Sequence, residues 1–264
     1  MTNLNILIVE GNNLADNEVF EKAAGASCSK NFKNLILKLE PNTNIKIINP
    51  AIDEQTKEAL DNMKDYDGII FTGGAMRLND MTDVIKKHIN FASNCFNHNK
   101  KILAICWGLQ VCSTAAGGKV APGKNGAHIG IASDVMINEN GINNLIYKNK
   151  KIKFNTPAFN FDEVCEVPSG AIILSSDKVN NVMGVYFKSG NSEIWGIQYH
   201  PDYEYWQMIN LCNVRKDQMI EKKYFKSEND FENHMNYIKE EEKKLDFVNR
   251  TCEVKNWLDI LKLD

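Results

Sequence analysis

The first half of the chain alternates short runs of apolar residues with segments in which apolar residues recur every three or four positions. Short apolar runs bounded by turn residues are typical of strands buried in a parallel sheet, and the longer period is typical of helices packed on that sheet. The pattern therefore predicts an α/β fold with a mainly parallel open sheet flanked by helices. The predicted strands are 5–10, 45–48, 66–71 and 102–105, and the predicted helices are 32–39, 54–63 and 82–97.

The remainder of the chain divides into a β-rich part and a helical part. Several short apolar runs between residues 150 and 199 are separated by turn residues, which predicts an antiparallel meander that extends the sheet. We expect one α/β domain over residues 1–204 and a helical extension over residues 205–264, packed on that domain. Residues 11–30 are polar, and we expect them to form a long loop past the C-terminal end of the first strand.

One junction between a strand and a helix carries a cysteine at its turn. The apolar run 102–105 leads directly to Cys106, and a segment with helical spacing opens at Trp107. A tight turn at this position lifts the side chain clear of the sheet, and the helix N-terminus behind it favours a thiolate. A buried structural cysteine would give the same local pattern. A second motif must therefore decide between the two interpretations.

The second motif is a histidine at the end of a late strand. An apolar, aromatic-rich run ends at His200, and a proline and two carboxylates, Asp202 and Glu204, follow it. A cysteine combined with a distant histidine and an acid is the arrangement in which the imidazole deprotonates the thiol and the acid orients the imidazole. Together the two motifs favour a nucleophilic Cys106.

Two segments of the chain resemble the motifs of class I, or triad, glutamine amidotransferases. They are A-I-C-W-G-L-Q at 104–110 and G-I-Q-Y-H-P-D-Y-E at 196–204. The resemblance implies a flavodoxin-like fold, with Cys106 as nucleophile and His200 as general base and then general acid. It also implies that Asp202 orients His200.

The sequence departs from the family pattern at a few positions. Ala104 stands where the family usually has Gly, and Asp202 stands where it usually has Glu. Because Asp is one methylene shorter, Glu204 is an alternative orienting residue, although Asp202 is favoured. Asn160 replaces the usual His of a segment that holds the α-amino acid end of glutamine in the family.

The resemblance also implies residues for substrate binding and for the oxyanion. A Gly pair, Gly73 and Gly74, follows the third strand, where the family supplies one amide to the oxyanion hole. The residue after the nucleophile, Trp107, supplies the other amide, and Gln110 belongs to the same set. A further histidine, His128, is not expected to be the base, because no acid follows it closely.

Composition limits the possible functions without choosing among them. The chain has 264 residues, of which 43% are hydrophobic and 25% charged, and a net charge of -3, which gives no electrostatic reason to expect nucleic-acid or membrane binding. We see no secretory leader and no apolar run of the about 20 residues that a membrane span needs. The seven Cys and five His residues show no metal-binding spacing. We expect a cytoplasmic protein with no metal and no cofactor.

Three functions remain open for a small-molecule substrate. The first is hydrolysis of the γ-carboxamide of L-glutamine through a γ-glutamyl thioester; since the chain lacks a GxxxxGK[ST] motif, an ammonia-using synthase would then be a partner in trans. The second is hydrolysis of γ-glutamyl amides or conjugates, as in similar hydrolases of amine catabolism. The third is a non-catalytic regulatory or binding module. Of the first two functions, glutamine hydrolysis is favoured over hydrolysis of larger amides. The presence of both the Cys106 motif and the His200 motif argues against a non-catalytic module.

Overall fold

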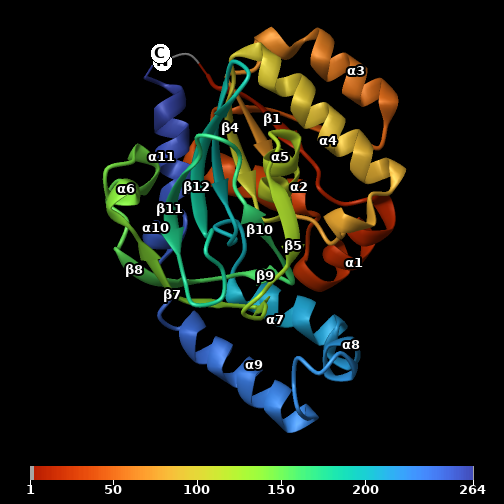
Figure 1. Ribbon diagram of the computed structural model, residues 1–264, viewed down its shortest axis with the longest axis vertical. Coiled ribbons are helices and arrows are strands. Elements are labelled where there is room, and N and C mark those ends of the chain that lie inside the picture. The colour runs from red at the N-terminus through yellow and green to blue at the C-terminus, as the bar shows by residue number, and fades with distance from the viewer. Residues whose placement is uncertain (1–2, 264) are drawn as a thin grey trace.

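The computed structural model describes residues 3–263 and contains one large mixed sheet (Figure 1). The strands are β1 Asn5–Val9, β2 Asn44–Ile48, β3 Gly68–Phe71, β4 Lys101–Ile105, β5 Lys119–Pro122, β6 His128–Ile129, β7 Ala132–Ile137, β8 Lys153–Thr156, β9 Phe159–Asn160, β10 Asp162–Glu166, β11 Ile172–Ser176, β12 Gly184–Ser189 and β13 Ser192–Ile197. The nine-stranded sheet has the order β2-β1-β3-β4-β13-β12-β11-β7-β8. Its strands from β2 to β13 pair in parallel and the rest pair antiparallel. The predicted fold class, a parallel sheet with an antiparallel extension, is confirmed.

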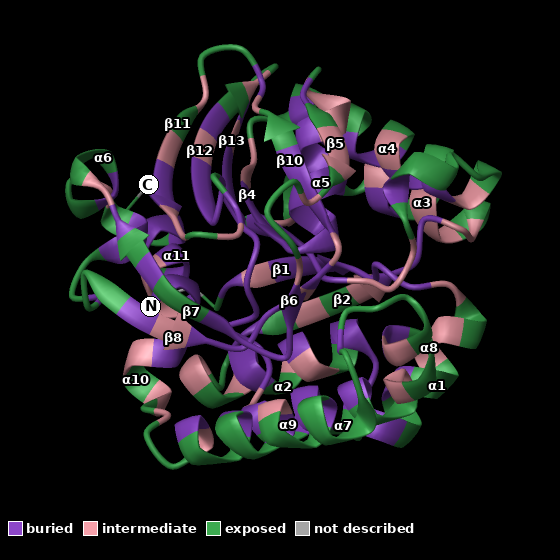
Figure 2. Cartoon of the chain, turned by 60° about the horizontal axis from the view of Figure 1, so that its bottom comes forward, coloured by how far each residue is buried: buried purple, intermediate pink, exposed green. Residues whose placement is uncertain are grey.

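Helices cover both faces of the parallel half of the sheet and others lie beyond it, so that residues 3–263 contain eleven α-helices. They are α1 Leu14–Ala24, α2 Cys28–Leu39, α3 Asp53–Asp61, α4 Asp83–Cys95, α5 Trp107–Ala115, α6 Glu139–Ile142, α7 Tyr205–Val214, α8 Lys216–Glu221, α9 Glu228–Glu242, α10 Phe247–Arg250 and α11 Cys252–Leu261, with short 3-10 turns at Met63–Asp65, Leu78–Asp80, Phe96–His98 and Leu145–Tyr147. Successive side chains of β1 point to opposite faces. Ile6 and Ile8 pack on the side of α2 and α11, whereas Leu7 and Val9 pack on the side of α3, α4 and α5. Figure 2 shows β13, near the middle of the sheet, largely buried, β2 at its edge partly exposed, and α9 exposed along its outer face.

The C-terminal helices are in contact with the α/β core. Trp257 of α11 is fully buried among apolar residues of the sheet, and a Cβ atom on Gly68 of β3 would lie 2.8 Å from its ring. Met208 and Leu211 of α7 pack with Phe20 of α1. Within the described residues, the segment from Tyr205 to Leu261 is mostly helical, as predicted, and a domain boundary at residue 204 stays a prediction.

The prediction of a long loop over residues 11–30 is wrong, because this segment contains α1 and the start of α2. Asn13 caps α1 by accepting a hydrogen bond from the Asp16 backbone N–H at 2.9 Å. Gly25 ends the helix with a left-handed backbone, at φ 81°. The apolar period of α1 is weak because Leu14 is 72% exposed while smaller alanines face the core. That pattern concealed the helix.

The predicted antiparallel meander over residues 150–199 is only partly present. β11, β12 and β13 form it, and β13 then pairs in parallel with β4. The earlier strands of this region pair with other partners: β8 with β7, β9 with β6, and β10 with β5. Apolar runs identify strands but not their partners, so the three short pairings could not be anticipated.

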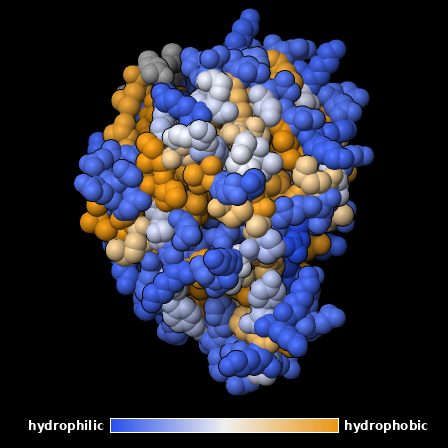
Figure 3. Space-filling view, viewed as in Figure 1, coloured by the Kyte–Doolittle hydropathy of each residue, from blue (hydrophilic) through white to orange (hydrophobic). Residues whose placement is uncertain are grey.

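The face of the molecule drawn in Figure 3 is mostly hydrophilic. Figure 3 shows that the hydrophobic side chains visible on this face gather over the antiparallel part of the sheet, near β11 and β12. Within residues 3–263, no helix is both long enough and apolar enough to cross a membrane.

Candidate active site

Cys106 lies at the turn between β4 and α5, as the sequence predicts. Its backbone has φ 50° and ψ -107°, a region that a residue with a side chain adopts only when its surroundings enforce it. The Cys106 N–H donates a hydrogen bond to the Ile197 carbonyl at 2.7 Å, which ties the turn to β13. A Cβ atom on Gly108 would lie 2.4 Å from the Phe71 carbonyl oxygen, so glycine is required for this close approach. The turn therefore presents one thiol at the C-terminal edge of the sheet.

His200 and Asp202 meet just beyond the end of β13. The His200 Nδ1 atom lies 3.1 Å from Asp202 Oδ1, and both side chains are buried. Cys106 lies close enough to His200 for a negative charge on its sulfur to raise the pKa of the imidazole, and its Sγ atom donates a hydrogen bond to the Phe159 carbonyl at 3.6 Å. Glu204 lies elsewhere, because its carboxylate accepts hydrogen bonds from Arg250 at 3.3 Å and from the Trp206 indole at 3.0 Å. Asp202, and not Glu204, is the carboxylate that contacts the imidazole.

The charges around His200 favour its protonated form. Burial alone lowers the pKa of His200, but the negative charges of Cys106 and Asp202 and the hydrogen bond with Asp202 outweigh burial and raise that pKa to about 10. Gln198 contributes a further contact, since its Nε2 donates to Cys106 Sγ at 3.4 Å. The arrangement can hold a thiolate next to an imidazolium.

The Gly pair after β3 lies against the same histidine. A Cβ atom on Gly73 would be 2.5 Å from His200 Cε1, so the imidazole packs directly on the glycine backbone. Gly74 lines the pocket around Cys106. Asn12 fixes this loop by accepting a hydrogen bond from the Ala75 N–H at 2.7 Å. Gly74 and Trp107, the first residue of α5, both line this pocket, whereas Gly73 is not among the residues that line it. An oxyanion in the pocket would need backbone donors from such residues.

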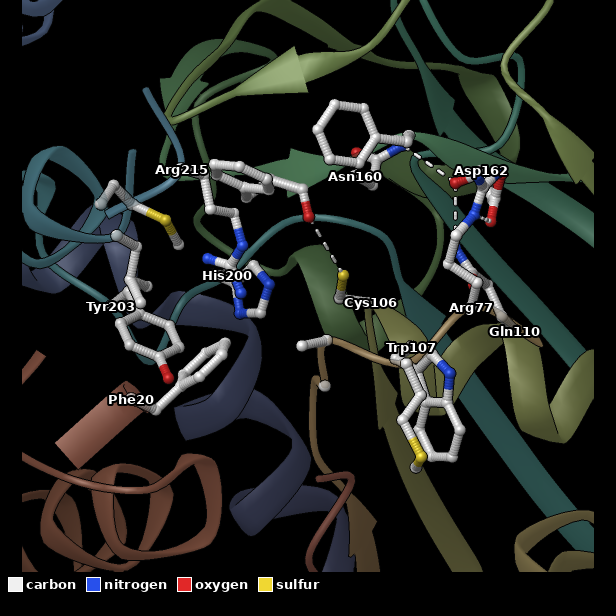
Figure 4. Close-up of a pocket in the computed structure, with 17 residues that line it drawn as sticks. Phe20, Arg77, Cys106, Trp107, Gln110, Asn160, Asp162, His200, Tyr203 and Arg215 are labelled. Carbon is white, nitrogen blue, oxygen red and sulfur yellow. Dashed lines mark hydrogen bonds and ion pairs between the residues drawn. The ribbon is translucent and has the colours of Figure 1, made fainter. Parts of the chain in front are cut away.

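A pocket opens above Cys106 and has two chemically different ends (Figure 4). One end contains Gln110, whose side chain donates to the Asp162 carbonyl at 2.9 Å. Arg77 forms a two-pronged ion pair with the buried Asp162 carboxylate, at 2.6 and 3.1 Å. Asn160 lines the pocket nearby and donates to the same Asp162 carbonyl at 3.1 Å. This end therefore offers charged and amide groups to a polar ligand.

The opposite end is aromatic and apolar, with one guanidinium. It is lined by Phe20, Phe159, Tyr203, Met208, Leu211 and Arg215. The motifs did not identify these residues, because they come from α1, β9 and the region of α7 and meet only in the folded chain. The caps of α1, Asn13 and Gly25, were the sequence signal that could have placed Phe20 on a helix.

His128 is not part of the pocket lining. Its Nδ1 atom lies 2.9 Å from Asn160 Oδ1 and its Nε2 atom lies 2.7 Å from Asp177 Oδ2, so both ring nitrogens have partners. Asp177 therefore holds His128, and His128 in turn holds the side chain of Asn160. Among residues 3–263, no group of three or more His, Cys, Asp or Glu residues is arranged to hold a metal ion.

Comparisons with known proteins identify the family and the relatives of this chain. The family model for "Glutamine amidotransferase class-I" matches residues 23–207. A γ-glutamyl-L-1-hydroxyisopropylamide hydrolase from a Pseudomonas species is 28% identical, over 99% of this chain and 94% of its own. A glutamine-hydrolysing GMP synthase subunit from Methanococcus vannielii is 30% identical, over 62% of this chain and 82% of its own.

A solved structure has the same fold. The crystal structure of a glutamine amidotransferase from Thermotoga maritima superimposes with a TM-score of 0.71 over 100% of both chains, at 17% sequence identity. The likeness includes the C-terminal helices, because the whole chain is covered.

Proposed function

Since this chain belongs to the class I glutamine amidotransferase family and is an amidohydrolase of that type, we propose that it hydrolyses γ-glutamyl amides with Cys106 as nucleophile. The observation that carries the proposal is the strained turn that presents Cys106 to the buried pair of His200 and Asp202 within one pocket. Asp202 orients the imidazole and stabilises its charge.

The reaction proceeds in two steps that use the same groups. The Cys106 thiolate attacks the γ-carbonyl carbon, and amides of Trp107 and of Gly73 or Gly74 stabilise the oxyanion. His200 then donates its proton to the amide nitrogen, the C–N bond breaks, and the amine leaves a γ-glutamyl thioester on Cys106. Water attacks the thioester as His200 takes its proton, which releases glutamate and restores the thiolate.

The charged end of the pocket suits the amino acid part of a γ-glutamyl group. The Arg77 guanidinium is half exposed and the Asp162 carboxylate is paired to it, so a substrate α-carboxylate and α-ammonium would meet groups of opposite charge. Gln110 holds the Asp162 backbone at this end, which supports its role in substrate binding.

A γ-glutamyl amide is favoured over glutamine by the other end of the pocket. Glutamine loses only ammonia, which needs no apolar surface, whereas the pocket lining includes Phe20, Phe159 and Leu211, which pack together. Figure 4 shows Phe20 on the His200 side of Cys106. The relative that matches nearly the whole chain is named for hydrolysis of a substituted γ-glutamyl amide. The motifs alone favoured glutamine, and these two observations shift the preference.

Glutamine hydrolysis is the second candidate, and the similarity to a glutamine-hydrolysing GMP synthase supports it. In that case ammonia would pass to a synthase partner in trans.

The test is amine and glutamate release from a panel of γ-glutamyl amides and from L-glutamine, with Cys106→Ala as the control. We expect at least one substituted amide to have a higher kcat/KM than glutamine, and Cys106→Ala to abolish turnover. Glutamine turnover exceeding that of every amide would instead support the second candidate. Turnover that persists in Cys106→Ala would contradict both.

A further inference from the structure

The aromatic end of the pocket contains a guanidinium that no acceptor of the described chain satisfies. Arg215 lies directly after α7, and its guanidinium carbon is 5.5 Å from the ring centroid of Phe20 and 5.4 Å from that of Phe159. Within residues 3–263, its side chain makes no hydrogen bond and no ion pair. The Asp16 carboxylate interacts with this guanidinium only electrostatically, from beyond salt-bridge distance. A partly buried guanidinium with five N–H donors and no acceptor is costly unless a ligand supplies one.

The position of His200 decides which part of a substrate reaches Arg215. His200 must donate its proton to the leaving nitrogen, so the leaving amine lies on the His200 side of Cys106. Figure 4 shows Arg215 on this side and Gln110 on the other. The Tyr203 ring packs edge-on against His200 at 5.1 Å, and Tyr203 is close enough to act electrostatically on Arg215. Arg215 therefore belongs to the leaving-group end.

We propose that Arg215 binds a carboxylate on the leaving amine, so that the substrates are γ-glutamyl conjugates of amino acids or related amino-carboxylates. Phe20 and Phe159 hold the guanidinium plane and present apolar surface to the rest of the leaving group. A planar guanidinium pairs with a carboxylate through two parallel hydrogen bonds, which selects such an amine over a neutral one. This inference rests on the proposed cleavage of γ-glutamyl amides by Cys106.

The test compares γ-glutamylphenylalanine with its neutral analogue γ-glutamylphenethylamide, which lacks only the carboxylate. In the wild type we expect kcat/KM to be about 10- to 100-fold higher for γ-glutamylphenylalanine, the effect of a charged hydrogen-bonded pair. Arg215→Gln should remove this preference by lowering kcat/KM for the acid alone. Lys222→Gln, which removes an exposed positive charge just after α8, is the matched control and should leave the preference intact.

Three results would overturn the proposal. They are equal turnover of the two compounds by the wild type, an equal loss for both in Arg215→Gln, and no loss in that variant. An equal loss would mean that Arg215 holds the γ-glutamyl part common to both compounds.

Binding measurements separate this inference from the proposed reaction. Calorimetry with Cys106→Ala should detect γ-glutamylphenylalanine, and adding Arg215→Gln should weaken that binding by about 10-fold or more. Arginine-dependent binding without any wild-type turnover would retain the site and reject the reaction. Turnover of both compounds, with binding that does not change in Arg215→Gln, would retain the reaction and reject the carboxylate site.

Discussion

The backbone of Cys106 has a positive φ angle, which contacts with neighbouring residues maintain. At Gly108 these contacts leave no room for a Cβ atom. The cost of such a conformation is on the order of 1–3 kcal/mol, and the hydrogen bond to Ile197 and the glycine at 108 help to hold it. The strain places the thiol where His200 can reach it. His200 in turn owes its raised pKa to two partners, Cys106 and Asp202.

Asp202→Asn should lower the pH at which activity is lost on the alkaline side. His200 must be protonated to act as general acid, and its pKa of about 10 keeps it so through neutral pH. Removing the negative charge of Asp202 removes one of the causes that raise this pKa, so the imidazolium loses its proton at lower pH. The alkaline limb of kcat against pH measures the shift.

Glu204→Gln is the matched control, because Glu204 contacts Arg250 and Trp206 and not His200. It should leave the alkaline limb in place. An unchanged limb in Asp202→Asn would mean that Asp202 does not set the charge of His200.

Local sequence patterns predicted which residues meet at the edge of the sheet better than they predicted the residues that line the rest of the pocket. Cys106, His200 and Asp202 stand in local patterns that tie each to a strand end, and parallel strand ends meet at one edge of a sheet. Arg215 stands in no such pattern. It follows α7, and only the fold brings it to Phe159.

At the scale of elements, the loop that carries His200 is held by two helices from opposite ends of the chain. Asn31 of α2 donates to the Asp202 carbonyl at 2.6 Å. Arg250, the last residue of α10, is buried and donates to the carbonyls of Pro201 and Tyr203 at 2.6 and 3.0 Å. The C-terminal helices therefore hold the loop that carries His200 through hydrogen bonds to its backbone.

Arg250→Met should lower kcat about 10- to 100-fold with little change in KM. The substitution leaves two buried carbonyls without donors, so the loop shifts while the substrate-binding end around Gln110 is untouched. Steady-state kinetics with a γ-glutamyl amide measures the split. Lys243→Met, at an exposed position of the same extension, should change neither constant. A proportional rise in KM with kcat unchanged would contradict a positioning role.

The elements themselves could be predicted wherever their apolar period was regular. β1 to β4 and α4 follow the expected positions, because buried strands and one-sided helices impose such periods. α1 was missed since its exposed Leu14 obscured the small buried residues, although Asn13 and Gly25 were readable as caps. The pairings of β5 with β10 and β6 with β9 depend on contacts distant in sequence.

At the scale of the whole molecule, α11 completes the core on one face of the sheet. Trp257, Val254 and Leu258 are fully buried among residues of β1 and α2. The helix is thus part of the cooperative core rather than a separate appendage, which agrees with relatives that match the whole chain.

Trp257→Ala should destabilise the entire protein by about 3–5 kcal/mol, the usual cost of removing a large buried aromatic side chain. Chemical denaturation followed by circular dichroism should show one transition at a lower midpoint. Trp206→Ala is the control, since Trp206 is 42% exposed, and it should cost much less. Two separate transitions in the wild type would show that the extension unfolds independently.

The central claim is that Cys106 carries the γ-glutamyl group as a thioester during hydrolysis, and mass spectrometry tests it most directly. A γ-glutamyl amide is mixed with the enzyme, the reaction is quenched with acid within a turnover, and the peptides are analysed. We predict one added γ-glutamyl group on the peptide that contains Cys106 and none in Cys106→Ala. Continued substrate hydrolysis with no adduct on Cys106, and with Cys106→Ala still active, would contradict the account.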